Sequence, residues 1–553
     1  MSASAANPNR KAAAVTLVSC GFVVALGAWL LPANLKSVGP ALLRAAGAGT
    51  PTLGAFGRDL VDLEKIGPAA LVLTAARATD DPRAPALATA LDEAATRQPG
   101  LAAWGGWDPF LDPLFNLRAD TTRRGSTPVL TFLMPEAARE KLRPTLANSG
   151  SLGVQALLKL RDLTATGRFV PATRPGGQPL DALILLSALL YQGERFAPPL
   201  QREIRSLTEK ALEKKDLGDL APFLMDLLSL GRRLDWAQLS ELLHRTENTR
   251  TVGEFAHLAR VAPDNLALIY SAALFSDSAD RAASYLILFG QAGLDDLRLA
   301  LSNGQGAVRL LLERQVPVNR SASFVLGSAA SFTLLHPQIT LGLKYLGYLL
   351  GVWLALRGLD RALVGVFDRA RPVDTFAHVK GGMMALLFAG LLVVTTEPFL
   401  LRAAPASEFQ VRLHLPVLFA TAELSTPEKS QPTTTMDSST LLSIGLFATL
   451  QVAMYFACLM KIREVSRQSV PPLVKLRLME NEENLFDGGL YVGIAGTATA
   501  LVLQVLRIIE PNLLAAYASN LFGIMCVAIV KIRHVRDYKR QLILEAQAEA
   551  KLS

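Results

Sequence analysis

The chain has 553 residues, of which half are hydrophobic and 19% are charged, and its formal net charge is +8. This length allows a membrane domain and a separate globular domain, and the charged fraction is below the quarter that is usual in soluble domains. No dense face of Lys and Arg with interleaved aromatic residues occurs, so we expect no nucleic-acid partner. Basic cytoplasmic loops account better for the excess positive charge.

The residues that commonly carry chemistry are sparse. All three cysteines, Cys20, Cys458 and Cys526, lie in apolar runs, and the six histidines are scattered. Neither a disulfide framework nor a Cys/His metal site is expected from this pattern, and no cofactor is expected. The chain lacks the nucleophile-elbow, zincin, Walker and Cys-x-x-Cys motifs, so we predict a protein that is not an enzyme. An envelope enzyme has no motif to support it.

The N-terminal segment 1–33 is predicted to be a signal anchor. Basic residues precede a long apolar run, Ala12–Leu31, which lacks a clear small-x-small cleavage site at its end. We expect this anchor to stay uncleaved, with its N-terminus in the cytoplasm. Leu17-Val-Ser-Cys-Gly21 resembles a lipobox, but the apolar run continues beyond Cys20, where a lipoprotein would become polar. Lipidation of Cys20 stays open as an alternative.

Residues 34–337 have nearly balanced acids and bases and should form an extracytoplasmic domain of short amphipathic helices. Asp, Ser, Thr or Pro opens many of these segments and Gly or Asn closes them. The expected helices are Leu53–Ile66, Pro68–Ala78, Ala84–Arg97, Gln201–Lys215, Leu220–Leu230, Asp235–Arg245, Val252–Val261, Asn265–Phe275, Ala279–Phe289 and Gly306–Gln315. Two segments, Pro128–Met134 and Arg168–Ala172, are predicted strands.

Two stretches of this domain resemble each other. Thr52-Leu-Gly-Ala-Phe56 opens a predicted helix pair that ends near Asp81, and Thr251-Val-Gly-Glu-Phe255 opens another that ends near Asp280. Stacked helix pairs suggest an α-solenoid, whose curved surface often binds a partner. The alternative is that two helical hairpins share common residues by chance.

Residues 338–540 are predicted to be a membrane domain, followed by a cytoplasmic tail, 541–553. The expected spans are Ile339–Leu356, Gly381–Leu400, Leu441–Met460, Gly488–Leu506 and Leu513–Ile532. The exported loop 402–439 contains Phe409–Leu415, whose alternation predicts a strand. The basic loops fall on one side if both termini are cytoplasmic. The predicted fold is therefore mainly α: a multi-pass helical protein of the bacterial inner membrane with a large extracytoplasmic helical domain.

The predicted spans contain few charges. Lys344 lies near the outer end of its span, from where its side chain can snorkel toward the membrane surface. Glu397, which precedes a proline, lies near the outer end of the next span. No acid or histidine lies at mid-membrane, so this chain alone should not form a carboxylate proton relay.

The last hairpin is rich in small residues. Gly489-x-x-x-Gly493 and Gly496 have the spacing that lets helices pack closely. Gly493-Ile-Ala-Gly-Thr497 resembles the Gly-Leu-Leu-Gly-Thr stretch of the ExbB/TolQ/MotA proton-channel family, and Ser519-Asn-Leu-Phe-Gly-Ile is similar to that family's last span. The resemblance covers about fifty residues, and the turn between the spans is shorter than in the family. It implies ring-like homo-oligomers around a single-span partner that supplies a carboxylate, with Thr497 and Ser519 lining the ion path.

Three functions follow from these patterns. The favoured one is a scaffold or assembly component that is embedded in the lipid bilayer and binds envelope proteins through its extracytoplasmic domain. The second is an ion-driven energiser subunit, as the family resemblance implies. The third is a transporter, although the spans show no inverted repeat. We expect protein partners and self-association through the last hairpin.

Overall fold

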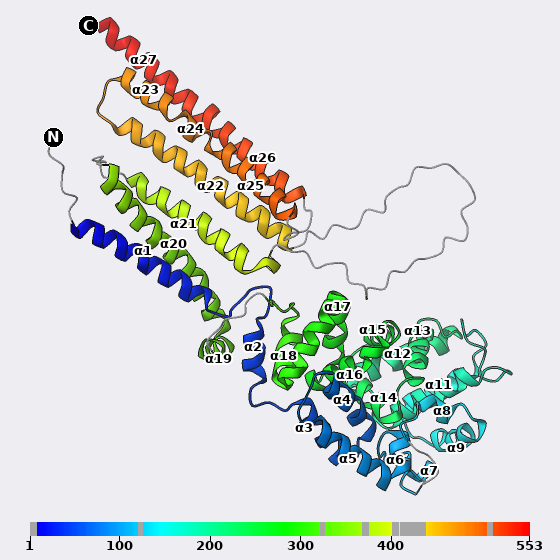
Figure 1. Cartoon of the computed structure of the whole chain (residues 1–553). Coiled ribbons are helices and arrows are strands. Elements are labelled where there is room, and N and C mark those ends of the chain that lie inside the picture. Colours follow the sequence, from blue (N-terminus) through cyan, green and yellow to red (C-terminus); the bar gives the residue numbers. More distant parts are fainter. Residues whose placement is uncertain are drawn as a thin grey trace. The chain divides into compact units, whose positions relative to one another are not determined.

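A computed structural model describes residues 8–119, 125–320, 327–367, 375–400, 409, 438–505 and 513–552 (Figure 1). The chain is mainly helical, as predicted, and no strand occurs within these ranges. It separates into two compact units. We call residues 40–318 the helical domain, and we call the described residues of 1–39, 319–400 and 438–552 the apolar-helix unit.

The helical domain consists of short helices. They are α2 (Pro40–Gly47), α3 (Leu53–Asp62), α4 (Ile66–Ala78), α5 (Ala84–Arg97), α6 (Pro99–Trp104), α7 (Asp112–Phe115), α8 (Val129–Leu133), α9 (Glu136–Ala147), α10 (Leu152–Lys159), η1 (Leu160–Asp162), α11 (Gln178–Gln192), α12 (Pro198–Lys214), α13 (Leu220–Gly231), α14 (Trp236–His244), α15 (Thr249–Val261), η2 (Pro263–Asn265), α16 (Leu266–Ser276), α17 (Ala279–Asn303) and α18 (Gln305–Arg314). Every residue of α11 from Leu180 to Leu190 and every residue of α16 from Ala267 to Phe275 is buried, so these two helices lie within the core.

The two similar stretches form two helix pairs, α3–α4 and α15–α16. In each pair an aspartate that follows the second helix accepts a backbone hydrogen bond near the start of the first. Asp81 Oδ2 accepts from Gly54 N at 2.8 Å, and Asp280 Oδ2 accepts from Glu247 N at 2.9 Å. A carboxylate at this position satisfies amide groups that have no partner within their own helix.

Contacts between the first and last helices close the domain. Helix α4 packs against α16, α2 packs against α18, and the rings of Phe56 and Phe275 meet edge to face at 5.0 Å. In an open solenoid each repeat contacts only its neighbours. These contacts distinguish the domain from an open array of helix pairs.

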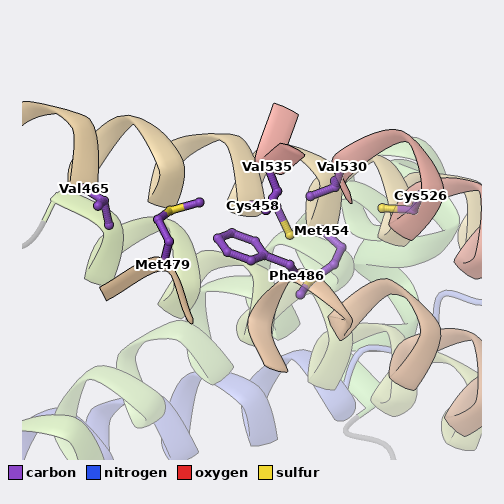
Figure 2. Packing of buried hydrophobic residues seen from close by; sticks show 8 residues of the cluster. All are labelled: Met454, Cys458, Val465, Met479, Phe486, Cys526, Val530 and Val535. Atoms are coloured by element: carbon purple, nitrogen blue, oxygen red, sulfur yellow. The ribbon is translucent and has the colours of Figure 1, made fainter. Parts of the chain in front are cut away.

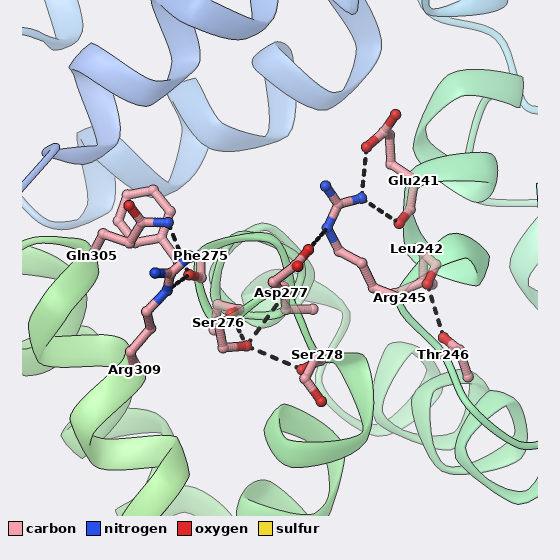
Figure 3. A network of polar contacts seen from close by, with 12 residues as sticks. Glu241, Leu242, Arg245, Thr246, Phe275, Ser276, Asp277, Ser278, Gln305 and Arg309 are labelled. Carbon is pink, nitrogen blue, oxygen red and sulfur yellow. Dashed lines mark hydrogen bonds and ion pairs between the residues drawn. The ribbon is translucent and has the colours of Figure 1, made fainter. Parts of the chain in front are cut away.

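Polar contacts at the end of α16 hold three helices together (Figure 3). The carbonyl of Phe275 accepts from Gln305 Nε2 at 3.1 Å and from Arg309 Nε at 3.2 Å, both on α18. Arg245, which follows α14, contacts Glu241 at 2.6 Å and Asp277 at 2.9 Å. Side chains thus satisfy carbonyls at a helix end and fix the packing of its neighbours.

Both predicted strands of this domain are wrong. Pro128–Met134 contains helix α8, and Arg168–Ala172 is irregular. A short apolar run is ambiguous between a strand and a buried helical turn, and here tertiary packing decides. Four of the five α8 residues are buried, and Phe132 stacks on the buried Trp104 with ring centroids 4.2 Å apart.

The apolar-helix unit contains longer helices. They are α1 (Pro8–Trp29), α19 (Gly327–Leu335), α20 (Pro337–Phe367), α21 (Thr375–Thr396), η3 (Pro398–Leu400), α22 (Ser438–Arg467), α23 (Pro472–Asn481), α24 (Glu483–Phe486), α25 (Gly488–Val505), α26 (Leu513–Ile529), η4 (Val530–Val535) and α27 (Arg536–Leu552). Among the described residues, two segments are long and apolar enough to cross a membrane, Ala12–Trp29 and Pro337–Ala362. The predicted strand Phe409–Leu415 falls almost wholly outside the described residues.

Helices α1 and α20 pack at a seam of glycines. A Cβ added at Gly351 would lie 2.7 Å from Ala25 N, and one at Gly347 would lie 2.7 Å from Ala28 Cβ. A Cβ at Gly21 would lie 2.5 Å from Gly351 O. Only glycine allows the two backbones to come this close. The Gly347-x-x-x-Gly351 spacing of α20 is the same sequence signal as in the last hairpin, and it was not among the predicted packing residues.

A second group of helices packs around sulfur and aromatic side chains (Figure 2). Its buried residues come from α22, α23, α24, α26 and η4 and are Met454, Cys458, Val465, Met479, Phe486, Cys526, Val530 and Val535. The π-helical turn η4 joins α26 to α27. In this turn His534 Nε2 lies 2.9 Å from the hydroxyl of Tyr455.

Candidate functional site

The strongest candidate site in the apolar-helix unit is a buried ion pair. Lys344 lies on α20 and Glu397 directly follows α21, and their side chains are 3% and 1% exposed. Lys344 Nζ lies 3.4 Å from Glu397 Oε1 and donates to Ala33 O at 2.8 Å and to Asn34 Oδ1 at 2.6 Å. These three acceptors occupy the three donor hydrogens of the ammonium group.

The carboxylate of Glu397 is also held by several donors. The hydroxyl of Tyr345 donates to Oε1 at 2.9 Å, and the backbone amide of Leu35 donates to Oε2 at 3.0 Å. Removing two charges from water costs several kcal/mol per ion unless such additional bonds compensate. The cluster meets that condition, because neutral donors and acceptors surround both charged groups.

The local sequence explains how the cluster forms. Helix α1 ends at Trp29, and Pro32 lacks the amide hydrogen that a continuing helix needs. Ala33 and Asn34 therefore lie in irregular backbone, where they accept hydrogen bonds from Lys344 of α20. Pro398 disfavours helical backbone at the residue before it, which ends α21 at Thr396 and leaves Glu397 at the helix terminus. Two prolines thus place the two ends of the cluster.

The cluster also holds the two chain segments that lead to and from the helical domain. Asn319 N donates to Val38 O at 2.9 Å, so these segments run side by side. The side chain of Asn319 reaches Thr396 O at 3.4 Å, next to Glu397. We call residues 33–38 and Asn319 the connectors. Both are bonded to the ends of apolar helices.

Lys344, which the sequence suggested can snorkel, has its partners within the protein. Its ammonium group is buried and bonded within the protein, because Glu397 and the first connector supply partners inside the unit. The signal in the sequence was one basic and one acidic residue near the outer ends of two apolar segments. The sequence alone does not show that these two residues lie side by side in the folded protein.

The predicted packing residues lie at the contact of α25 with α26. A Cβ added at Gly493 would lie 3.0 Å from Ser519 O, and one at Gly489 would lie 3.2 Å from Cys526 Cβ. Gly523, on the facing helix, is tighter still, at 2.6 Å from Gly489 O. Gly496 is half-buried, one turn further along α25.

Both residues predicted to line an ion path bond to the same carbonyl. Thr497 Oγ1 donates to Gly493 O at 3.0 Å, and Ser519 Oγ lies 3.4 Å from the same oxygen. A third polar side chain, Gln451 on α22, reaches the same helix contact. Its Nε2 donates to Gly489 O at 3.0 Å, and its Oε1 is buried without a partner among the described residues. These bonds are typical of polar groups that join helices in apolar surroundings.

Among the described residues, no group of His, Cys, Asp or Glu is arranged to hold a metal ion. No protein-family model matches this chain, and no curated protein or solved structure is significantly similar to it. The assignment of function therefore rests on the geometry of the chain itself.

Proposed function

We propose that this protein is a membrane-embedded scaffold or assembly component that presents its helical domain to envelope proteins. The observation that carries the proposal is the cluster around Lys344 and Glu397. It bonds the first connector to α20 and to Glu397 at the end of α21, and Asn319 bonds to Thr396 of α21. Both segments that lead to and from the helical domain are therefore bonded to the apolar-helix unit.

The membrane topology is part of this proposal. We infer six spans, with both termini in the cytoplasm and the helical domain outside it. The length and composition of α1 and α20 support two of the spans, and helices α21, α22, α25 and α26 occupy the other four predicted positions. A membrane-impermeant thiol reagent should label Arg97→Cys in intact cells, in a chain without Cys20. It should label Gln547→Cys only after the cells are opened.

Site-specific photo-crosslinking in cells tests the partner-binding role in the full chain. Probes at exposed apolar positions of the helical domain, such as Leu152 and Val261, should give discrete adducts with other proteins. Probes at Leu346 and Ile532 in the apolar helices serve as the comparison. If only the probes at Leu346 and Ile532 gave protein adducts, the helical domain would not be the partner-binding part and the proposal would fail.

An energiser subunit is the second candidate, and the polar contacts of the last hairpin favour it. Ser519 is buried, and Gln451 Oε1 lacks a partner within the described chain. An ion path needs such polar groups among apolar helices. In that case Thr497→Ala and Ser519→Ala should abolish an ion-dependent cellular activity while leaving the amount of protein in the membrane unchanged.

A further inference from the structure

A buried carboxylate in the helical domain organises three arginines. Asp181, in the first turn of α11, is fully buried and lies 2.6 Å from Arg139 Nη1, 2.7 Å from Arg143 Nη2 and 2.6 Å from Arg161 Nε. Burial by itself raises the pKa of Asp181, but hydrogen bonds from Arg143, Arg161 and Arg139 lower that pKa below its ordinary value. The carboxylate therefore stays ionised and fixes the guanidinium groups.

A hollow of about 460 Å³ lies beside this cluster, between α9, α10 and η1. Its charged lining residues are Arg143, Lys159, Arg161 and Asp162. The side chains of Arg143 and Arg161 are 30% and 27% exposed, so they are anchored in the core and open to solvent at once. Arg161 uses only its Nε to bind Asp181, and its two Nη groups bond to no described residue.

The local charge balance is positive. Glu136 binds Arg139 and Arg143, so two carboxylates, Glu136 and Asp181, face three arginines and leave one positive charge in excess. Lys159 and Asp162 on the rim add no net charge, because one is positive and the other negative. They form no ion pair with each other within the described chain. A planar guanidinium with two free Nη groups matches the oxygens of a phosphate or carboxylate group.

We propose that this hollow is a binding site for an oxyanion, a phosphate or carboxylate group on a small ligand, with Arg161 and Lys159 as its contacting groups. Arg143 contributes positive charge from the wall, and Asp181 positions both arginines without touching the ligand. The arginine side chains are already fixed in the free protein, so little side-chain entropy is lost when a ligand binds. The site does not depend on the proposed scaffold function.

Calorimetric titration of the full chain in detergent tests this site, with inorganic phosphate in one arm and succinate in the other. Saturable binding is expected in at least one arm, and the arm shows which oxyanion the site prefers. Arg161→Lys keeps a positive charge beside Asp181 but loses the guanidinium fork, so binding should weaken about tenfold. Lys159→Gln, on an exposed side chain outside the Asp181 cluster, should weaken it severalfold without changing the circular dichroism spectrum.

Arg97→Gln is the matched control, because it removes an exposed cation of the same domain on α5, away from the hollow. It should leave the affinity unchanged. The proposal is overturned if neither anion binds saturably to the unaltered chain. It is equally overturned if Lys159→Gln and Arg161→Lys, both folded, bind as tightly as the unaltered chain, or if Arg97→Gln weakens binding as much as they do.

Discussion

Two buried carboxylates, Asp181 in the helical domain and Glu397 in the apolar-helix unit, are stabilised in different ways. Asp181 is surrounded by three arginines, two of which also reach solvent. Glu397 has a single cationic partner, and a tyrosine hydroxyl and a backbone amide supply its other bonds. Around Asp181, water solvates part of two guanidinium groups, so an excess of positive charge costs little free energy. Around Glu397, the dielectric constant is lower, which favours one cation for one anion and neutral hydrogen-bond donors.

The largest effect is expected when the centre of the arginine cluster is neutralised. Asp181→Asn leaves three cations facing one remaining carboxylate, and we expect the helical domain to lose about 3–5 kcal/mol of stability. Urea unfolding followed by tryptophan fluorescence measures this, because Trp104, Trp107 and Trp236 lie in that domain. The control Asp92→Asn, at an exposed position of α5, should change stability by less than about 0.5 kcal/mol. Equal effects of the two substitutions would show that Asp181 is not a structural centre.

Breaking the ion pair of Lys344 with Glu397 should lower the stability of the protein somewhat less. Lys344→Met leaves Glu397 buried without a cation but with the bonds from Tyr345 and Leu35, so we expect a loss of about 3 kcal/mol. Thermal unfolding of the full chain in detergent is the measurement. The double variant Lys344→Met/Glu397→Gln removes both charges and should recover most of the loss. A double variant no more stable than the single one would contradict a charge-pair role.

A third carboxylate, Asp235, sharpens the comparison because it forms no ion pair with any residue that the structure describes. Burial raises its pKa to about 7, while hydrogen bonds from Ser126 and from the backbone of Gln238 and Ala237 oppose that rise. Between about pH 4 and pH 7 the folded state therefore holds a proton that the unfolded state has lost. Stability from this group is highest at the acidic end of that window and declines as the pH rises toward 7.

Asp235→Asn should remove this pH dependence. Between pH 5 and pH 7 the decline in stability of the helical domain should be smaller in the variant by about 2 kcal/mol. Parallel urea unfolding series at several pH values measure the difference. The amide keeps an acceptor for the Gln238 amide, which caps α14. Identical pH slopes in both chains would mean that Asp235 is ionised in the folded protein.

The sequence predicted helices far better than it predicted contacts. Helix α5 and most of the helix starts in the domain follow from apolar spacing and from Pro, Ser, Thr or Asp at the N-terminus. The predicted strand Pro128–Met134 is wrong because this apolar run has no decisive period. Pairings such as Lys344 with Glu397, or Asp181 with its arginines, join residues distant in sequence, and no local pattern encodes them.

The smallest effect is expected at the glycine seam of α1 and α20. Gly351→Ala places a Cβ 2.7 Å from Ala25 N, so the helices must separate, at a cost of about 1–2 kcal/mol. Gly342→Ala, on the same helix, meets no atom within 4 Å and is the matched control. Thermal unfolding in detergent should show a lower midpoint for Gly351→Ala alone. A lower midpoint for both would indicate a general effect of substitution in α20.

The native mass of the gently solubilised complex, with its co-purifying chains identified, tests the scaffold role most directly. We expect a mixed assembly in which other proteins are bound through the helical domain. A ring of several copies around one smaller single-span protein would contradict it. That result would favour the energiser function and direct attention to Thr497 and Ser519.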